Sequence, residues 1–447
     1  MNSRLILLGA AFCLLCIGSA AGTTFYVDVN GTNPVPPYAD WSTAATNIQD
    51  AVDASTNSDL ILVTDGIYAA GGRPLTGYML TNRVVIDKPV TVQSANGATA
   101  TIIQGYQIPG AIYGAEAIRC VYLTNGASLV GFTLTNGATL AGGDDVQAGG
   151  DTSAAGILCS DSGATVSNCV VVSNSAGDFA GGAYFGTFYN CLFFGNQAPL
   201  YGGATLGCGL YNCTLTGNSS SFIGSGDAFG TLNNCIVYGN DPAGGNYGFS
   251  TLNYCCTTPD PGGMGNITND PAFVDFAGGN FHLQSNSPCI NSGNNAYVSG
   301  TDLDGNPRTA GGTVDIGAYE FQNPRSIISY AWLQQFGLPT DGSVDYTNLD
   351  STGFSVYQDW IAGLDPTNAA SVLVMSSDVS GDAISGITVT WQSVDNRTYY
   401  VQRAVDLTAQ PAFSSIQSNL VGQAGTTSFT DTTATNGGPY FYRVGVQ

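Results

Sequence analysis

The chain has 447 residues, of which 60 are glycine and only 9% are charged. Its 32 acidic residues face ten basic ones, and the resulting net charge of −22 excludes the basic surface that a nucleic-acid phosphate backbone requires. A hydrophobic share of 43% can bury a large core and so excludes a disordered chain, while the many Gly, Tyr and Phe residues are unsuited to an all-helical fold.

The first 21 residues have the pattern of a secretory signal peptide. Arg4 precedes an apolar run over residues 5–17, and Gly18, Ser19, Ala20 and Ala21 supply the small residues of a cleavage site. The run is shorter than the roughly 20 apolar residues that a membrane anchor needs. We therefore expect cleavage after Ala20 or Ala21, a secreted or cell-surface mature protein, and no transmembrane segment in it.

A repeat of 22 residues occupies the middle of the chain. Its marker is a cysteine that follows an asparagine and precedes a second asparagine by five positions; these cysteines are Cys169, Cys191, Cys213 and Cys235. Gly-rich strand segments lie before the last three of them. A period of roughly 20–29 residues indicates a solenoid. Short strands separated by Gly and Asn predict the coils of a parallel β-helix.

The repeat also predicts which side chains point inward. The second residue after each cysteine is apolar in every copy: Val171, Phe193, Leu215 and Val237. Because side chains alternate along a strand, the cysteine and this residue are expected in the core. Coils about 4.8 Å apart then stack like residues, and the asparagines five positions after the cysteines are expected to hydrogen-bond along the axis.

The cysteine ladder has three interpretations. Buried reduced thiols are favoured, because parallel side chains hold their Cβ atoms too far apart for good disulfide geometry. One or more disulfides are the second interpretation. A metal site is the third and is disfavoured, since zinc normally requires Cys-x-x-Cys or histidine partners and His282 is the only histidine.

Two stretches flanking the repeat carry a family resemblance. Residues 25–28, 41–52 and 60–68 resemble the start of bacterial right-handed β-helix proteins of the pectate-lyase-like superfamily, in which a short helix, here about residues 43–54, plugs the open end. Residues 281–293, 302–308 and 315–320 resemble the choice-of-anchor Q region that ends such β-helices. The resemblance implies a mainly β protein with a right-handed parallel β-helix over residues 22–322, and it implies export.

Enzymes of this superfamily need groups that the repeat lacks. The resemblance implies an Arg or Lys base for a lyase, usually assisted by calcium, or clustered aspartates for a hydrolase. No Arg or Lys occurs between Arg119 and Arg308, and His282 belongs to the terminal motif. Arg308 itself is expected to form a structural ion pair with Asp315 or Glu320.

One insertion, over residues 142–151, offers catalytic candidates. Asp144, Asp145 and Asp151 place three carboxylates on one loop, where they can bind calcium or act as acid and base. A solvated loop is the favoured interpretation. Exposed aromatic residues are a separate candidate for a surface that stacks on sugar rings; these are Tyr184, Tyr201, Tyr211, Phe222 and Tyr238. The alternative is that about half of such residues are simply members of the core or of the ladders.

Residues 323–370 are predicted to be a helical, dockerin- or EF-hand-like linker. Helices are expected at residues 326–335 and 357–362, and Gly363 ends the second. The loop between them has EF-hand spacing, with calcium ligands expected from Asn348, Asp350, Thr352, the Phe354 carbonyl and Asp359. The favoured alternative is a decayed loop that keeps its turn without calcium. Calcium is the one cofactor that the sequence suggests.

Residues 371–447 return to strand patterns. Trp391 in an early strand, and Tyr440 to Val444 near the end, resemble a small fibronectin type III-like β-sandwich. Such modules space, dock or attach their neighbours.

Together these features predict a secreted or cell-surface β-helix protein that presents an elongated face to extracellular polysaccharide or to a cell-surface component without catalysis. The alternative is an extracellular polysaccharide lyase or glycoside hydrolase, and a third class is a structural spacer or adhesin. A groove that gathers two or more carboxylates with a basic or calcium partner distinguishes catalysis from binding.

Overall fold

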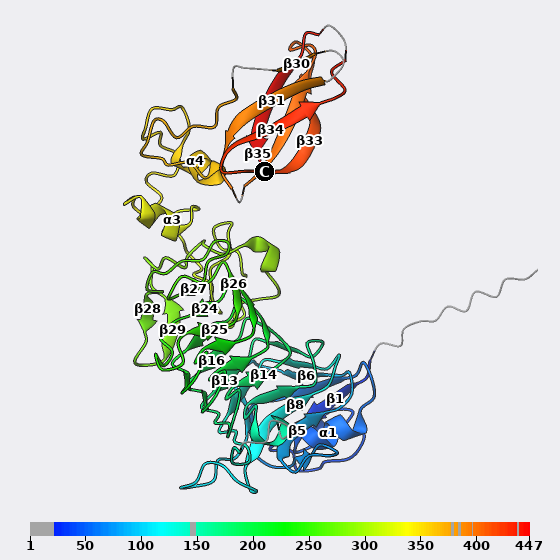
Figure 1. Ribbon diagram of the computed structural model, residues 1–447. Coiled ribbons are helices and arrows are strands. Elements are labelled where there is room, and N and C mark those ends of the chain that lie inside the picture. Colours follow the sequence, from blue (N-terminus) through cyan, green and yellow to red (C-terminus); the bar gives the residue numbers. More distant parts are fainter. Residues whose placement is uncertain (1–21, 144–148, 377–379, 383–385, 396, 436–437) are drawn as a thin grey trace, which may run out of the picture.

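The computed structural model describes residues 22–143, 149–376, 380–382, 386–395, 397–435 and 438–447 (Figure 1). Residues 1–21, predicted to be a signal peptide, and the candidates Asp144 and Asp145 therefore lie outside the described residues. The described chain forms a long stack of coils, a short helical segment and a C-terminal pair of antiparallel sheets. No helix among these residues is long and apolar enough to cross a membrane.

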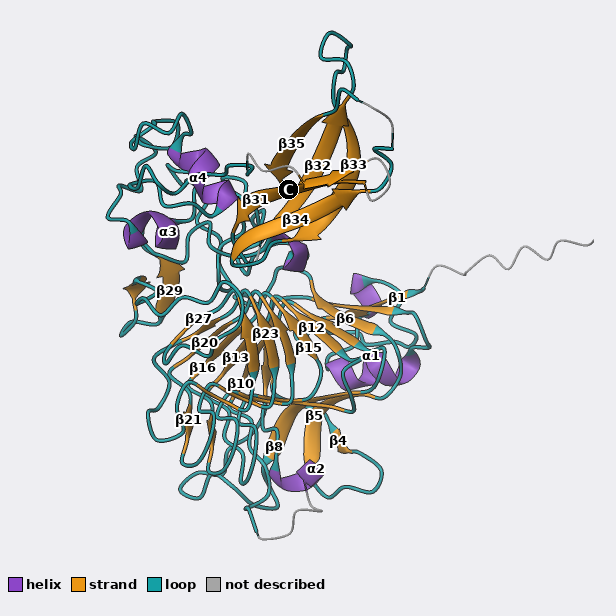
Figure 2. Ribbon diagram, turned by 45° about the horizontal axis from the view of Figure 1, so that its top comes forward, coloured by secondary structure: helices purple, strands orange, loops and turns teal. Residues whose placement is uncertain are grey.

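The coils are built from three parallel sheets, which the chain visits in the order A, B, C on each turn (Figure 2). Sheet A comprises β1 (Thr24–Val27), β2 (Leu60–Val63), β6 (Thr91–Ser94), β9 (Ser128–Val130), β12 (Thr165–Ser167), β15 (Thr187–Tyr189), β19 (Gly209–Tyr211), β23 (Thr231–Asn233) and β26 (Thr251–Asn253). Sheet B comprises β3 (Gly66–Tyr68), β7 (Thr101–Gln104), β10 (Thr133–Thr135), β13 (Val170–Val172), β16 (Leu192–Phe194), β20 (Thr214–Thr216), β24 (Ile236–Val237) and β27 (Cys256–Thr257).

Sheet C comprises β5 (Thr81–Ile86), β8 (Ile118–Leu123), β11 (Ile157–Cys159), β14 (Ala183–Tyr184), β18 (Thr205–Leu206), β22 (Asp227–Ala228) and β25 (Tyr247–Gly248), with β4 (Arg73–Pro74) added antiparallel at its edge. Each strand pairs with its equivalent one coil later, as in the pairing of β14 with β18 and of β18 with β22. This cyclic order of parallel strands is a parallel β-helix. A small pair, β17 (Gln197–Ala198) and β21 (Ser219–Ser220), extends two of the turns.

A helix closes the first coil, as predicted, but it starts later than predicted. α1 (Ile48–Ala54) buries Ile48, Ala51 and Val52 against the coil. Trp41–Thr43 form a separate 3₁₀ turn, because the Asp40 carboxylate accepts hydrogen bonds from the first amides. The α-helix begins only where Asn47 caps the amide of Asp50.

The interior contains the predicted cysteine ladder. Cys169, Cys191, Cys213 and Cys235 are fully buried, as is the apolar residue two positions after each of them. All ten cysteines in the described residues are free and buried, which confirms the reduced-thiol interpretation for these positions. Burial raises the pKa of the Cys169 thiol to about 12, so this thiol is neutral at physiological pH.

The predicted asparagine ladder is also present, and its side chains are buried. The Asn174 side-chain amide donates to the Asn196 side-chain oxygen over 3.0 Å, and Asn196 donates to Asn218 in the same way. Asn218 continues the ladder to Asn240, again over 3.0 Å. Each rung satisfies polar groups that have no access to water.

A second set of asparagines, those that precede the cysteines, holds the end segment against the coils. Asn168, Asn190, Asn212 and Asn234 all have left-handed backbone conformations, with φ between 51° and 54°. Their side-chain amides donate to carbonyls of the end segment: those of Thr301, Asp302, Ser299, Tyr297 and Asn294. Residues 294–302 therefore run lengthwise over four coils.

The parallel coils end at β27, and residues 258–322 form an irregular cap rather than further coils. The cap contains the antiparallel hairpin β28 (Phe273–Asp275) and β29 (Asn280–Leu283) and the 3₁₀ turn η3 (Asn295–Tyr297). Arg308 lies inside this cap, 2% exposed, and donates to the carbonyls of Asp315 and Gly317. Its guanidinium lies 4.0 Å from the Glu320 carboxyl, in a structural role.

The tail has two short helices. α3 (Tyr330–Gln335) starts four residues later than predicted, because Ser329 is its cap and the Ser326 hydroxyl instead donates to Asp345. α4 (Val356–Ala362) has a capping box at Ser355, and Gly363, in the left-handed conformation, ends it.

Two three-stranded antiparallel sheets complete the chain. One orders β30 (Ser380–Asp382), β31 (Gly386–Ser393) and β34 (Gly425–Asp431); the other orders β33 (Ser414–Val421), β32 (Thr398–Ala404) and β35 (Phe441–Val446). They share a core around Val389, Trp391, Tyr399 and Val401.

Candidate functional site

The outer face of sheet C carries a band of aromatic side chains, which we call the aromatic strip. It consists of Phe179, Tyr184, Phe185, Tyr201, Phe222, Phe229 and Phe249. Leu158, Leu206 and Ala228 form its buried floor. The strip spans successive coils, so it runs along the axis of the β-helix.

Three phenylalanines of the strip occupy the same position in their coils. Phe185, Phe229 and Phe249 each follow the last residue of a sheet C strand, and the strand register makes them equivalent to one another and to Gly207. All four have left-handed backbones, with φ of 55°, 58°, 55° and 64°. A bulky residue in this conformation is strained by about 1–2 kcal/mol, and glycine is the residue that relieves it.

These phenylalanines also expose their rings. Phe185 is 39% exposed, Phe229 53% and Phe249 73%. A ring that costs backbone strain and yet remains in water does not contribute the core packing that usually justifies such strain. Strained and exposed residues of this kind are typical of binding sites.

Contacts between rings join the strip residues into two groups. Phe229 and Phe249 stack with centroids 5.1 Å apart, and Tyr184 stacks on Phe185 at 4.1 Å. Tyr201 makes a T-shaped contact with Phe229, with centroids 6.1 Å apart. Tyr184 and Phe185 thus form one pair, and Tyr201, Phe229 and Phe249 belong to a second group of rings.

A buried carboxylate holds the turns beneath Phe229 and Phe249. Asp227 is fully buried inside the coil, where it accepts hydrogen bonds from the Thr205 hydroxyl at 2.7 Å, the Ser250 hydroxyl at 2.6 Å and the Gly230 amide at 3.0 Å. Burial raises its pKa to about 6, although the three donors favour the ionised form. Asp227 thus positions the strip and is inaccessible to a ligand.

The structure places three of the five predicted sugar-stacking residues in the strip and two elsewhere. Tyr184, Tyr201 and Phe222 lie in the strip. Tyr211 instead stacks on Tyr189, with centroids 5.1 Å apart, and approaches Tyr297 of the cap. Tyr238 packs against the hydrophobic cluster at the end of the coils.

Sequence reasoning missed Phe185, Phe229 and Phe249. The signal was present, because Phe185 and Phe229 lie six residues before the ladder cysteines Cys191 and Cys235, as Gly207 does before Cys213. Phe249 lies six residues before Cys255, whose thiol accepts from the Cys235 amide and so continues the ladder. An alignment of the copies on the cysteines places Phe, Gly, Phe and Phe in one column. Glycine and phenylalanine have no secondary-structure preference in common, and only the left-handed backbone explains why both occur at this position.

Of the catalytic candidates, the structure describes Asp151 alone. Its carboxylate is 9% exposed and accepts hydrogen bonds from the amides of Met79 and Leu80. The fully buried Arg119 donates to the Ser153 carbonyl and to the Asn82 side chain nearby. Burial lowers the pKa of Arg119 to about 10, and the charge of Asp151 opposes this shift. Asp151 thus anchors the base of the insertion.

Four of the predicted calcium ligands lie in the loop between α3 and α4, and Asp359 lies within the first turn of α4. The Asp350 carboxylate accepts hydrogen bonds from the amide and hydroxyl of Thr352 through one oxygen, Oδ1. Asp350 Oδ2 and Asp359 Oδ1 are buried and have no hydrogen-bond donor among the described residues. Burial raises the pKa of Asp359 to about 6, and the charges of Asp350 and Asp365 add to this shift.

The other predicted ligands contribute less to this cluster. Asn348 is exposed and Phe354 is partly buried. Asp365, which the EF-hand spacing did not include, lies close enough to Asp359 to influence its charge. In the part of the chain that the structure describes, no group of three or more His, Cys, Asp or Glu side chains is arranged to hold a metal ion.

No protein-family model and no curated protein matches the sequence. Among solved structures, the chain is similar to pectate lyase Pel9A, with 13% identity, a TM-score of 0.32 and coverage of 66% of this chain and 96% of that one. It is also similar to a rhamnogalacturonan lyase, with 13% identity, a TM-score of 0.33 and coverage of 54% and 65%. A rice weevil pectin methyl esterase has 11% identity, a TM-score of 0.23 and coverage of 48% and 74%. Likeness at this level carries no argument about activity, and the β-helix assignment stands on the sheet order.

Proposed function

We propose that the protein is a secreted or cell-surface β-helix protein that binds an extracellular polysaccharide along its aromatic strip, without catalysis. The observation that carries the proposal is the row of exposed, backbone-strained phenylalanines Phe185, Phe229 and Phe249. Aromatic faces bind the apolar C–H faces of sugar rings while the ring hydroxyls stay in water.

The spacing of the rings fits an extended chain that lies along the axis. Coils are about 4.8 Å apart, so Phe185 and Phe229, two coils apart, are separated by roughly 10 Å along the axis. This is comparable to two residues of an extended polysaccharide. Phe249 on the next coil extends the surface by one more step.

The residues beneath the aromatic rings favour binding without catalysis. Asp227, the carboxylate under the strip, is enclosed and already accepts three hydrogen bonds. The coils that carry the strip have no Arg or Lys in their sequence from residue 120 to 307. A lyase requires a base such as Arg or Lys, and a hydrolase requires an accessible pair of acidic groups. Neither is supplied by these residues.

The rest of the chain completes this proposal. We infer that residues 1–21 direct export, that residues 281–320 end the β-helix as a choice-of-anchor Q-like region, and that the C-terminal sheets form a fibronectin type III-like module. The shared core around Trp391 and the antiparallel sheets support the last of these. A sandwich of this kind would space the β-helix from its attachment.

Affinity electrophoresis through gels that contain single polysaccharides tests the proposal. Wild-type protein should be retarded by at least one polysaccharide, and a Phe229→Ala, Phe249→Ala double variant should lose most of that retardation. Tyr346→Ala is the matched control, because Tyr346 is as exposed as Phe249, at 73%, but lies in the tail. Equal retardation of the double variant and the wild type would exclude the strip as the binding surface.

We propose in addition a structural calcium site at Asp350 and Asp359. Their two buried oxygens without donors are the specific observation, because buried carboxylate oxygens are normally hydrogen-bonded or bound to a cation. Oxygen ligands suit calcium, and the small number of carboxylates implies a weak, roughly millimolar, affinity. Calorimetry of the full chain with millimolar calcium should show heat; its absence at all concentrations would leave the loop purely structural.

A further inference from the structure

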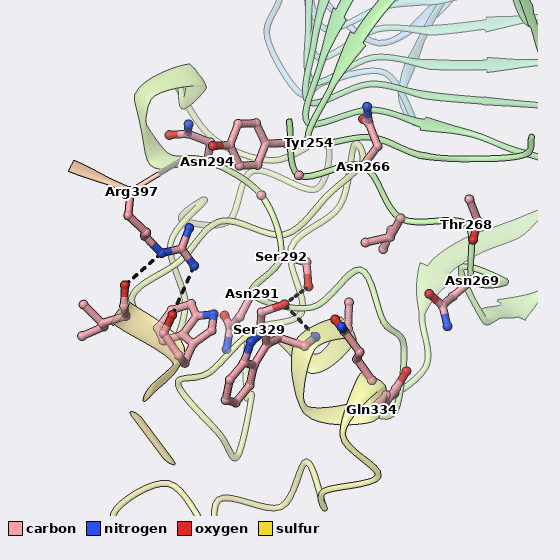
Figure 3. Close-up of a pocket in the computed structure, with 18 of the residues that line it drawn as sticks. Tyr254, Asn266, Thr268, Asn269, Asn291, Ser292, Asn294, Ser329, Gln334 and Arg397 are labelled. Carbon is pink, nitrogen blue, oxygen red and sulfur yellow. Dashed lines mark hydrogen bonds between the residues drawn. The ribbon is translucent and has the colours of Figure 1, made fainter. Parts of the chain in front are cut away.

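We propose that the cavity between the end of the β-helix and the tail is a second carbohydrate site, which takes a short, neutral oligosaccharide independently of the aromatic strip. Figure 3 shows the residues that line this cavity. Its volume is about 1100 Å³. Its walls come from the last coil, the cap, α3, α4 and the first residues of β32. Three units of the chain therefore meet around one space.

The cavity is lined with side chains suited to hydroxyl groups. Thr268 and Asn269 approach it from the cap, and Gln335 approaches it from α3. These three side chains have no hydrogen-bond partner among the described residues, so their donors and acceptors are available to a ligand. A carboxamide offers a donor and an acceptor side by side, which matches a pair of neighbouring sugar hydroxyls.

Aromatic side chains stand among these polar groups. Trp332 of α3, Trp360 of α4 and Tyr254 of the last coil all contribute to the lining. Trp332 is fixed by an edge contact with Phe336, with centroids 4.9 Å apart. Polar amides next to indole rings can bind both the hydroxyl edge and the apolar face of a sugar ring.

The charges around the cavity select against an anion. Arg397 is the one basic residue in the lining, and its guanidinium donates to the Ile361 carbonyl at 2.9 Å and to the Trp360 carbonyl at 3.2 Å. It therefore serves the carboxyl end of α4, where a positive charge is favourable. Asp260 also lines the cavity, and the whole chain carries a net charge of −22. A neutral ligand avoids this negative field.

The site differs from the strip in shape as well as in chemistry. The strip is an elongated surface that suits a long chain, whereas the cavity is a compact hollow, open to solvent, with room for a few rings at most. A ligand that contacts the last coil, α3 and β32 at once binds only the arrangement in which these units are together. Binding should therefore also stabilise the junction between the β-helix and the tail.

Saturation-transfer NMR and calorimetry with defined oligosaccharides test this inference. The probes are cellotetraose, mannotetraose, xylotetraose and galactotetraose, with tetragalacturonate as the anionic arm. At least one neutral tetraose should bind the full chain, and an Asn269→Ala, Gln335→Ala double variant should weaken that binding about tenfold or more, since two hydrogen-bonding side chains are lost. Both residues lack protein partners, so the variant should fold normally, which its melting temperature verifies.

The strip variant separates the two sites. Phe229→Ala, Phe249→Ala should bind the tetraose as the wild type does while losing the long polysaccharide, and the cavity variant should do the reverse. Unchanged tetraose binding by Asn269→Ala, Gln335→Ala would overturn the inference. Tighter binding of tetragalacturonate than of every neutral probe, or binding of none of the five, would overturn it as well.

Discussion

Replacing Phe229 by glycine and by alanine tests whether the strip phenylalanines are held under strain. Phe229 is 53% exposed, so about half of the roughly 2 kcal/mol gained by burying a phenylalanine is present, and the stacked contact with Phe249 adds about 0.5–1 kcal/mol. Both substitutions lose this total of about 1.5–2 kcal/mol. Only glycine also removes the left-handed penalty of about 1–2 kcal/mol.

The two variants should therefore rank in an unusual order. Glycine in a strand or turn is normally less stable than alanine by about 0.4–1 kcal/mol, because the unfolded chain gains freedom. At φ of 58° the strain relief exceeds this cost, and Phe229→Gly should be more stable than Phe229→Ala by about 0.5–1 kcal/mol. Both variants should bind polysaccharide equally poorly, since both lack the ring.

The assay is the urea midpoint of the β-helix unfolding transition, measured for both variants under one condition. Gly207→Ala is the matched control, because Gly207 occupies the equivalent position and a Cβ there would lie 3.2 Å from the Phe185 ring. That substitution should lower the midpoint. A Phe229→Gly variant less stable than Phe229→Ala would refute the strain argument and with it the main reason to regard these residues as a binding surface.

Three further predictions follow from the buried groups. Burial raises the pKa of Asp227 to about 6 and of Asp315 to about 7, against ordinary values of 3.8, so the folded chain binds protons that the unfolded chain has released. The unfolding free energy should therefore fall as the pH rises through this range, and the melting temperature should be higher at pH 5 than at pH 8; the opposite trend would show that these carboxyls are not buried. Asp359→Asn should raise the melting temperature in calcium-free buffer, because it removes a buried charge near Asp350, and should abolish any rise caused by millimolar calcium; a calcium response that survives the substitution contradicts the proposed site. The ladder thiols should react with a thiol reagent only after denaturation, and rapid labelling of the native protein would place them at the surface.

The repeat alone was sufficient to predict the coils. A 22-residue spacing of Cys169, Cys191, Cys213 and Cys235 leaves one way to stack like residues, and the strand alternation then determines which side chains are inside. The asparagine rungs followed from the same stacking. These features depend on local periodicity, which a sequence displays directly.

Other features of the fold could not be predicted from the repeat, because the periodicity does not specify the contacts that determine them. One example is the set of asparagines that precede the ladder cysteines, which are Asn168, Asn190, Asn212 and Asn234. They were recognised as part of the repeat, but their side chains bind a segment that in most cases lies more than 60 residues away. No local pattern specifies that segment. Helices α1 and α3 begin later in the chain than predicted, because side-chain caps, and not the spacing of apolar residues, determine where a helix begins.

The candidate sites were likewise predicted only in part from the sequence. Tyr184, Tyr201 and Phe222 were predicted, as exposed aromatic residues, to belong to a sugar-stacking face. The strained phenylalanines required knowledge of the backbone at their turns, and the junction cavity required the arrangement of three units that lie far apart in the sequence.

The most direct test of the central claim is a crystal structure of the chain with a fragment of the polysaccharide that it retains best. We predict an extended fragment that runs parallel to the β-helix axis, with sugar rings stacked on Phe185, Phe229 and Phe249 and with every glycosidic bond intact. A fragment that lies across the coils, away from the strip, would contradict the account, and so would a cleaved fragment in a groove between carboxylates.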